Sequence, residues 1–149
     1  MSNRRAMRAM TSLHRAVLRL THGRVGASLG SMRVIELVTR GRKSGAERRA
    51  ILTVPIVETS PGGDVLVVVA SRGGDDQPPA WYLNLVAEPR VVVADAGGEP
   101  RPYRARTATE AERARLWPRV TTAYCGYAEY QRKTRRVIPL VLLEPAEPS

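Results

Sequence analysis

A glycine-bounded basic turn, Gly41–Gly45, is the part of the chain best suited to bind an anion. Its two glycines let the backbone bend so that successive N–H groups point at one oxyanion. Arg42 adds a fork of donors, Lys43 a point charge and Ser44 a hydroxyl group. A solvated hairpin tip would explain the same residues, so that alternative stays open. Further basic residues flank the turn, namely Arg40, Arg48 and Arg49.

A second candidate begins where an apolar segment runs into the loop Ala70-Ser71-Arg72-Gly73-Gly74. A helix is predicted soon after this loop, because Pro78 and Pro79 suit a first helical turn. Hydroxyl groups at strand ends and N–H groups at helix N-termini hold polar ring edges and phosphates well. The pattern alone is equally compatible with Trp81 of this helix packing in the core.

Three of the seven aromatic residues of the chain, Tyr124, Tyr127 and Tyr130, fall close together. Steps of three place them on one side of a predicted helix. Such a cluster suits a stacking wall for a flat substrate, with phenol groups as donors. The alternative is that the rings pack on the core with their hydroxyls outward. Cys125 has no evident activating partner and is interpreted as a packing residue.

The rest of the chain offers little catalytic chemistry of its own. Both histidines, His14 and His22, precede the body of the domain, so a Ser-His-Asp or Cys-His arrangement is not expected there. The sequence contains neither zinc-ligand spacing nor a glycine-rich nucleotide motif. We therefore expect no metal, and we expect an organic cofactor to carry any reaction.

The net charge of +10 is concentrated in the first third of the sequence. Residues 1–49 contain twelve Arg or Lys and two acidic residues, whereas residues 50–149 contain twelve of each. A local excess favours one anion-binding region over a uniformly basic surface. Nucleic-acid binding would need aromatic residues interleaved with the basic ones, and none precedes Trp81. No nucleic-acid partner is therefore expected.

Residues 3–20 have the spacing of an amphipathic helix. Such a helix either covers one end of the core or docks on a membrane surface. The chain has one cysteine, no apolar run long enough to span a bilayer and no signal peptide. These features predict a cytoplasmic protein, peripheral at the inner face of the cell membrane if the helix docks there.

The hydrophobic pattern predicts an α+β fold with about six mostly antiparallel strands in a barrel and peripheral helices. Short turns between the first three strands predict antiparallel pairing, and residues 65–70 should be buried on both faces. The alternation at 101–107 and the proline at 139 suggest exposed or edge strands. Strands are predicted at residues 34–39, 48–57, 65–70, 91–94, 101–107 and 137–143.

Two further helices are predicted towards the C-terminus. The pattern Thr109-x-x-Glu112 is a capping box that begins the first, and the second follows Trp117-Pro118 and runs to about Tyr130. The length of the chain predicts a single domain over residues 1–149. Its parts are the N-terminal helix and connector at 1–30, the core at 31–145 and a tail at 146–149.

Taken in order, these segments resemble the deazaflavin-dependent nitroreductase family, from about residue 20 to Pro145. The resemblance implies a split β-barrel of the FMN-binding-like type that binds coenzyme F420. It also implies hydride transfer to a quinone, an activated alkene or a nitroaromatic. The matching segments are Gly41-Arg42-Lys43-Ser44-Gly45, Val69-Ala70-Ser71-Arg72-Gly73-Gly74, Pro79-Ala80-Trp81-Tyr82-Leu83-Asn84-Leu85, Glu112-Arg113-Ala114-Arg115-Leu116-Trp117, Tyr124-x-x-Tyr127-x-x-Tyr130-Gln131 and Ile138-Pro139.

By this resemblance the phosphate and acidic tail of the coenzyme bind at the basic turn, and its ring binds at the strand-end loop and the helix after it. Ser71 and Tyr127 are the predicted catalytic residues, which polarise or protonate the acceptor. A non-enzymatic F420 carrier and an FMN-binding reductase are the alternatives. The predicted coenzyme contacts are Arg42, Lys43, Ser44, Arg48, Arg49, Ala70, Ser71, Arg72, Pro79, Ala80, Trp81, Tyr82 and Asn84, and the predicted substrate contacts are Tyr124, Tyr127 and Tyr130.

Overall fold

The computed structural model describes residues 32–95 and 98–146. The helix predicted at residues 3–20 lies outside this part of the chain, as does the tip of the turn at Gly97. The division into a helix and connector at 1–30, a core at 31–145 and a tail at 146–149 therefore stays a prediction.

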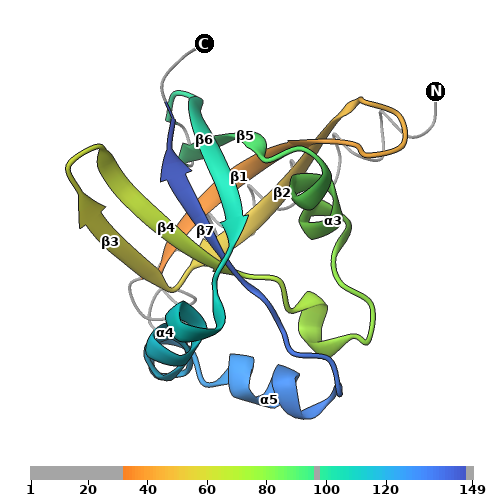
Figure 1. The fold of residues 1–149 in the computed structure, drawn as a ribbon, viewed down its shortest axis with the longest axis vertical. Helices are drawn as coiled ribbons and strands as arrows, with labels where there is room; N and C mark the ends of the chain where they lie inside the picture. Colours follow the sequence, from red (N-terminus) through yellow and green to blue (C-terminus); the bar gives the residue numbers. More distant parts are fainter. Residues whose placement is uncertain (1–31, 96–97, 147–149) are drawn as a thin grey trace, which may run out of the picture. The chain divides into compact units, whose positions relative to one another are not determined.

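A seven-stranded antiparallel sheet forms the frame of the described residues (Figure 1). Its spatial order is β2-β1-β5-β6-β7-β4-β3. Every neighbouring pair is antiparallel. The short turns near the start of the sequence predicted this for the first strands, as β1–β2 and β3–β4 show. The strands are β1 (Arg33–Arg40), β2 (Glu47–Val54), β3 (Ile56–Ser60), β4 (Gly63–Val69), β5 (Arg90–Asp95), β6 (Arg101–Thr107) and β7 (Leu140–Pro145).

The sheet curls so that its two edges approach each other. Strands β2 and β3 are the two edges in the spatial order, yet Pro55 alone separates them in the chain. A flat sheet of this width could not join its edges through one residue, so it must bend into a half-open barrel. The sequence predicted one strand over 48–57. That prediction is wrong at Pro55, because proline cannot donate to a ladder and the chain changes edges there.

The core fills the concave face of this sheet. Ile35, Leu37, Leu66 and Val68 are each at most 1 % exposed and belong to one cluster of buried apolar side chains. In β4 the alternate residue Val67, which points to the other face, is also fully buried. The prediction that this strand is buried on both faces is therefore confirmed.

Helices α3 (Ala80–Ala87), α4 (Glu110–Ala123) and α5 (Gly126–Arg132) lie at the periphery of the sheet (Figure 1). Helix α3 begins at Pro79 and packs against β1, β2 and β6. The predicted capping box of α4 is present: Thr109 Oγ1 accepts from Glu112 N at 3.2 Å, and Glu112 Oε1 accepts from Thr109 N at 2.9 Å. A short 3₁₀ turn, η1 (Arg72–Gly74), follows β4.

The break between α4 and α5 lies at Tyr124 and Cys125, not at Trp117-Pro118 as the sequence predicted. Helix α4 continues through Pro118, although proline removes one hydrogen bond from a helix interior. Leu116 and Val120, which lie on either side of this proline, are fully buried. The burial of these two side chains outweighs the tendency of proline to interrupt a helix.

The strand at 101–107 is exposed on one face as predicted, but neither it nor the strand after Pro139 lies at an edge of the sheet. Strand β6 lies between β5 and β7, and β7 lies between β6 and β4. The alternation of β6 arises because one of its faces is exposed, not because it lacks a neighbour. Pro139 precedes β7, so it leaves the ladder intact, and its carbonyl accepts a hydrogen bond from Ala70 N at 3.0 Å.

Candidate functional site

The basic turn after β1 is attached to helix α3 by one buried side chain. Asn84, which is 3 % exposed, accepts from the backbone N–H of Arg42 at 3.2 Å and from its Nη1 at 3.4 Å. Its Nδ2 donates to Thr39 Oγ1 at 3.2 Å. Asn84 therefore holds the basic turn against helix α3, and both of these segments contain predicted coenzyme contacts.

The turn itself is closed by backbone hydrogen bonds. Gly41 N donates to Ala46 O at 2.7 Å, and Gly45 N donates to Gly41 O at 2.8 Å. Gly45 has a φ of 72°, which favours glycine. The side chains of Arg42, Lys43 and Ser44 stay exposed, so they are free to meet a ligand from solvent. The Ser44 hydroxyl accepts from Ala46 N at 3.2 Å and keeps its own hydrogen to donate.

The two arginines after the turn lie on opposite faces of β2. Arg48 is the register partner of the buried Thr39, so it shares the face that α3 covers. A Cβ atom built on Gly41 would lie 3.4 Å from Arg48 Nε, which places this guanidinium beside the turn. Arg49 points to the other face and forms an ion pair with Glu36 at 2.7 Å. Arg48 therefore lies beside the basic turn, whereas Arg49 is paired with Glu36 on the other face of β2.

The loop after β4 has an unusual backbone. Arg72, Gly73 and Gly74 have φ values of 46°, 64° and 88°. Arg72 is the one non-glycine residue with positive φ in the described chain, and such strain often occurs at functional sites. Ala70 is fully buried, and Ser71 is 8 % exposed.

Helix α5 lies directly against this loop. A Cβ atom on Gly74 would lie 2.7 Å from the Tyr130 carbonyl oxygen, which is closer than real Cβ contacts. Glycine is therefore required at position 74 by both its φ and this close approach. The loop that follows β4 and the helix that carries Tyr127 and Tyr130 are therefore neighbours in the fold.

The three tyrosines form one cluster, although two helices supply them. Tyr124 ends α4, whereas Tyr127 and Tyr130 belong to α5, so the prediction of a single helix is wrong. Their ring centroids are 5.2 to 6.5 Å apart in edge-to-face geometry. Gly126 makes this possible, because a Cβ atom there would lie 2.5 Å from the Tyr124 ring. Cys125 is exposed, which corrects its interpretation as a packing residue.

Tyr127 is the buried member of the cluster, with 6 % of its surface exposed. Its hydroxyl shares a hydrogen bond of 2.8 Å with Thr53 Oγ1 of β2. Burial raises the pKa of the Tyr127 phenol, while the bond to Thr53 opposes that shift. The phenol is therefore neutral at physiological pH and retains a proton to donate.

The remaining predicted coenzyme residues lie at the start of α3. Pro79 is buried and Ala80 is exposed. Trp81 and Tyr82 are half-buried against the core cluster, with ring centroids 6.5 Å apart at 88°. The Tyr82 hydroxyl shares a hydrogen bond of 3.0 Å with Thr107 Oγ1 of β6. Each side chain thus packs on the core and keeps part of its surface accessible.

Sequence reasoning missed Thr39 and Thr53, which anchor Asn84 and Tyr127. A signal for Thr39 exists in the sequence: it follows Ile35 and Leu37 at steps of two, which places it on the core face of the strand. Thr53 carried no such signal, because its partner Tyr127 lies 74 residues further along the chain.

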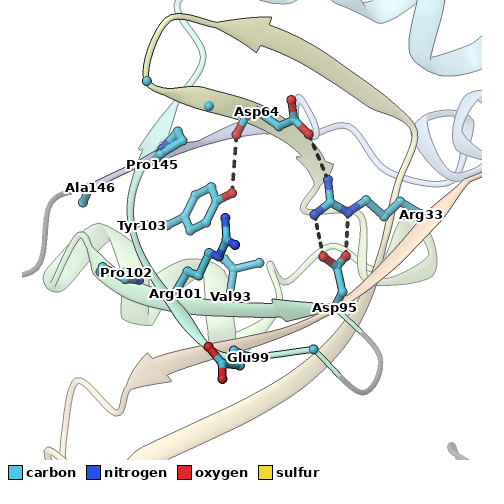
Figure 2. A pocket seen from close by; sticks show the side chains of 13 residues that line it. Arg33, Asp64, Val93, Asp95, Glu99, Arg101, Pro102, Tyr103, Pro145 and Ala146 are labelled. Atoms are coloured by element: carbon cyan, nitrogen blue, oxygen red, sulfur yellow. Dashed lines mark hydrogen bonds and ion pairs between the residues drawn. The ribbon is translucent and has the colours of Figure 1, made fainter.

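A cavity of about 640 Å³ lies elsewhere in the sheet (Figure 2). It is lined by residues at the beginnings of β1 and β4, whereas the candidate site uses the ends of these strands. Three of its charged side chains pair with one another, because Arg33 bonds to Asp95 at 2.6 Å and contacts Asp64 at 3.5 Å. It contains none of the predicted site residues.

The described residues form neither a metal site nor a membrane-spanning helix. No group of three His, Cys, Asp or Glu side chains in residues 32–95 and 98–146 has the geometry to hold a metal ion. In the same part of the chain, no helix has the length and apolar character needed to cross a bilayer.

Comparison with known proteins gives consistent matches. A profile of the F420H(2)-dependent quinone reductase family matches residues 10–145. An F420H(2)-dependent quinone reductase of Mycobacterium tuberculosis (strain ATCC 25618 / H37Rv) is 36 % identical over 137 residues, which is 88 % of this chain and 87 % of the relative. The expectation of an F420-dependent reductase family is thereby confirmed, while the nitroreductase label stays a prediction.

Solved structures support the same fold. The structure of an F420-H2 dependent reductase (FDR-A) superposes with a TM-score of 0.62 at 37 % identity, covering 75 % of this chain and 94 % of its own. A structure described as a domain-swapped dimer also gives a TM-score of 0.62, at 32 % identity, covering 91 % of this chain and 99 % of its own. The split β-barrel fold expected from the sequence is confirmed.

Proposed function

The chain belongs to the F420H(2)-dependent quinone reductase family, and from this premise we propose that it transfers a hydride from reduced coenzyme F420 to a flat, electron-poor acceptor of the quinone type. Activated alkenes and nitroaromatics share the electron-poor character of a quinone and are the acceptors to compare. The enzyme is an F420H2-dependent reductase by family. The acceptor and the residue roles below are the proposal.

The observation that carries the proposal is the close approach of the Ser71 loop to helix α5, where Gly74 packs on the backbone of Tyr130. A hydride acceptor must lie directly against the coenzyme ring, so the two walls of such a site have to be adjacent. The loop and the helix that carries Tyr127 and Tyr130 are far apart in sequence, and their contact supports assigning them to one site.

The residues present fit an anionic coenzyme with a flat ring. Arg42, Lys43 and Arg48 supply exposed positive charge at a turn that Asn84 holds in place. These side chains would hold the phosphate and the acidic tail through charge-assisted hydrogen bonds. The accessible sides of Trp81 and Tyr82 would line the ring, together with Ala70, Arg72, Pro79 and Ala80 of the neighbouring loop and helix.

Bound coenzyme supplies the hydride, and the chain supplies orientation and a proton. Tyr124 and Tyr130 would stack against the acceptor, and their edge-to-face packing orients the rings. The Ser71 hydroxyl and the neutral Tyr127 phenol are the groups that would donate a hydrogen bond to the acceptor oxygen. Both are partly shielded from water, which strengthens such bonds.

A binding titration tests the coenzyme assignment. Purified protein is titrated with oxidised F420 and, in parallel, with FMN, and ligand fluorescence is followed. We expect F420 to bind with a dissociation constant of about a micromolar or tighter and FMN to bind far more weakly. Preferential binding of FMN would make the protein an FMN-dependent reductase on the same fold.

Turnover with a panel of acceptors tests the second half of the proposal. Reduced F420 is mixed with a quinone, an activated alkene or a nitroaromatic, and its oxidation is followed optically. The quinone is expected to give the highest kcat/KM. Binding of F420 without turnover of any acceptor would point instead to a non-enzymatic carrier.

Membrane contact remains a prediction for residues 3–20. Their helical spacing of apolar and basic residues suits an anionic membrane surface, where lipid-soluble quinones are found. Co-sedimentation with anionic vesicles, compared with a chain that lacks residues 3–20, measures this contact. Equal sedimentation of both chains would exclude this segment as the anchor.

A further inference from the structure

The guanidinium of Arg136 donates to backbone carbonyls at both ends of the loop that carries Ser71. Arg136 Nε donates to Asp75 O at 2.8 Å, and Nη2 donates to Ser71 O at 2.9 Å. Longer bonds of 3.3 Å and 3.5 Å join the same guanidinium to Ala70 O and Gln77 O. One side chain therefore closes the loop from residue 70 to residue 77.

This loop needs such a clamp because its backbone is strained. Arg72, Gly73 and Gly74 all have positive φ, and the left-handed conformation is costly for arginine. A guanidinium is a planar fork with five donors, so it can serve several carbonyls at once. The ammonium group of a lysine has three donors at one point and cannot span both ends of the loop.

Arg136 is also hydrogen-bonded to helix α5, which carries Tyr127 and Tyr130. Its carbonyl oxygen accepts from Gln131 Nε2 at 2.7 Å, and Gln131 directly follows Tyr130 in α5. Its N–H donates to Thr134 Oγ1 at 3.3 Å, and that hydroxyl donates to Asp76 Oδ1 at 2.7 Å. The segment around Arg136 thus links the two walls of the candidate site.

We propose that Arg136 is a positioning residue for hydride transfer, which sets the spacing between the Ser71 loop and the tyrosine cluster. The inference rests on the proposed function. A displacement of about 1 Å can lower a reaction rate by roughly 100-fold, so turnover responds strongly to this spacing. We expect coenzyme affinity to depend mainly on the basic turn at 41–45, where the phosphate and acidic tail would bind and which Asn84 contacts directly. Residues of the clamped loop would line only the ring.

The test compares three variants with the wild type. Arg136→Lys keeps the charge but loses the fork, and Arg136→Ala opens a space that free guanidinium can fill. Arg135→Gln is the matched control, because Arg135 is the exposed neighbour. For each we measure the dissociation constant for F420, kcat with a quinone, and hydrogen exchange of residues 70–77 in the free protein.

We expect Arg136→Lys to lower kcat by roughly 10- to 100-fold while the dissociation constant for F420 changes by less than about threefold. Exchange of residues 70–77 should accelerate, because the closed loop opens more often. Added guanidinium should restore part of the kcat of Arg136→Ala. Arg135→Gln should match the wild type in all three measurements.

Unchanged kcat in folded Arg136→Lys would overturn the proposal. So would equal losses of turnover and F420 affinity without guanidinium rescue, since that pattern describes general destabilisation. If Arg136→Lys does not fold, Gln131→Glu replaces the donor to Arg136 O by a carboxylate oxygen, which repels that carbonyl, and should also lower kcat. A wild type that neither binds F420 nor reduces an acceptor would refute the proposed function, while hydrogen exchange still tests the clamp.

Discussion

Replacement of Asn84 by alanine is expected to weaken both folding and coenzyme binding. Asn84 makes one hydrogen bond to the Arg42 backbone, one to the Arg42 guanidinium and one to Thr39 Oγ1. Asn84 and Thr39 are 3 % and 2 % exposed, so water does not easily replace the lost partner. Two neutral hydrogen bonds and one unpaired hydroxyl correspond to about 2–3 kcal/mol of unfolding free energy.

For a chain of this length that loss lowers Tm by about 5–10 °C. The released turn no longer presents Arg42 in a fixed position, and we expect the dissociation constant for F420 to rise roughly tenfold, which is about 1.4 kcal/mol. Thermal unfolding followed by circular dichroism and a fluorescence titration measure the two effects.

Two further variants separate the contributions. Thr39→Val removes the acceptor of the Asn84 Nδ2 hydrogen bond but leaves Asn84 in contact with the turn. It should therefore lower stability while F420 affinity stays close to that of wild type. Val86→Ala alters an exposed residue of the same helix and should change neither quantity by more than about 0.5 kcal/mol. If Asn84→Ala binds F420 as tightly as wild type, the turn is not positioned by Asn84 and this account of the site is wrong.

Three other predictions address α4 and the tyrosine cluster. Arg106 and the capped helix start hold the pKa of Glu112 at about 2, so its stabilising effect is present above about pH 4.5 and is lost as the pH falls towards 2. Glu112→Gln should therefore lower the free energy of unfolding by about 1 kcal/mol at pH 7, a value reduced because Glu112 is partly exposed. Urea unfolding should show that the stability of this variant depends less on pH between pH 5 and 2 than that of wild type. Gly126→Ala should displace the Tyr124 ring and raise the KM for the acceptor in steady-state assays without changing F420 affinity. Tyr127→Phe should lower kcat more than it weakens F420 binding, and unchanged turnover would remove Tyr127 from the mechanism.

Local signals in the sequence were reliable where a segment's own residues decide its structure. The capping box at Thr109 and Glu112 begins a helix as predicted, since its hydrogen bonds are formed within four residues. The apolar run at 65–70 forms a strand buried on both faces because its residues have no polar face to expose. The glycines at 41 and 45 likewise mark a turn whose basic side chains remain exposed.

Tertiary structure decided which of these elements became neighbours. Pro118 remains inside a helix because Leu116 and Val120 are buried on either side of it, and local propensity cannot report that burial. Strand β7 is interior because β4 and β6 pair with it from distant parts of the chain.

The sequence by itself determined the chemistry available to this protein: a basic turn, a glycine-rich loop, three tyrosines and no histidine in the body of the domain. Only the folded chain decided their arrangement. Asn84 reaches the turn 42 residues before it, and Arg136 reaches Ser71 65 residues before it. Such contacts depend on the curl of the sheet and the path of the connecting loops, and no local pattern records a distance between segments so far apart.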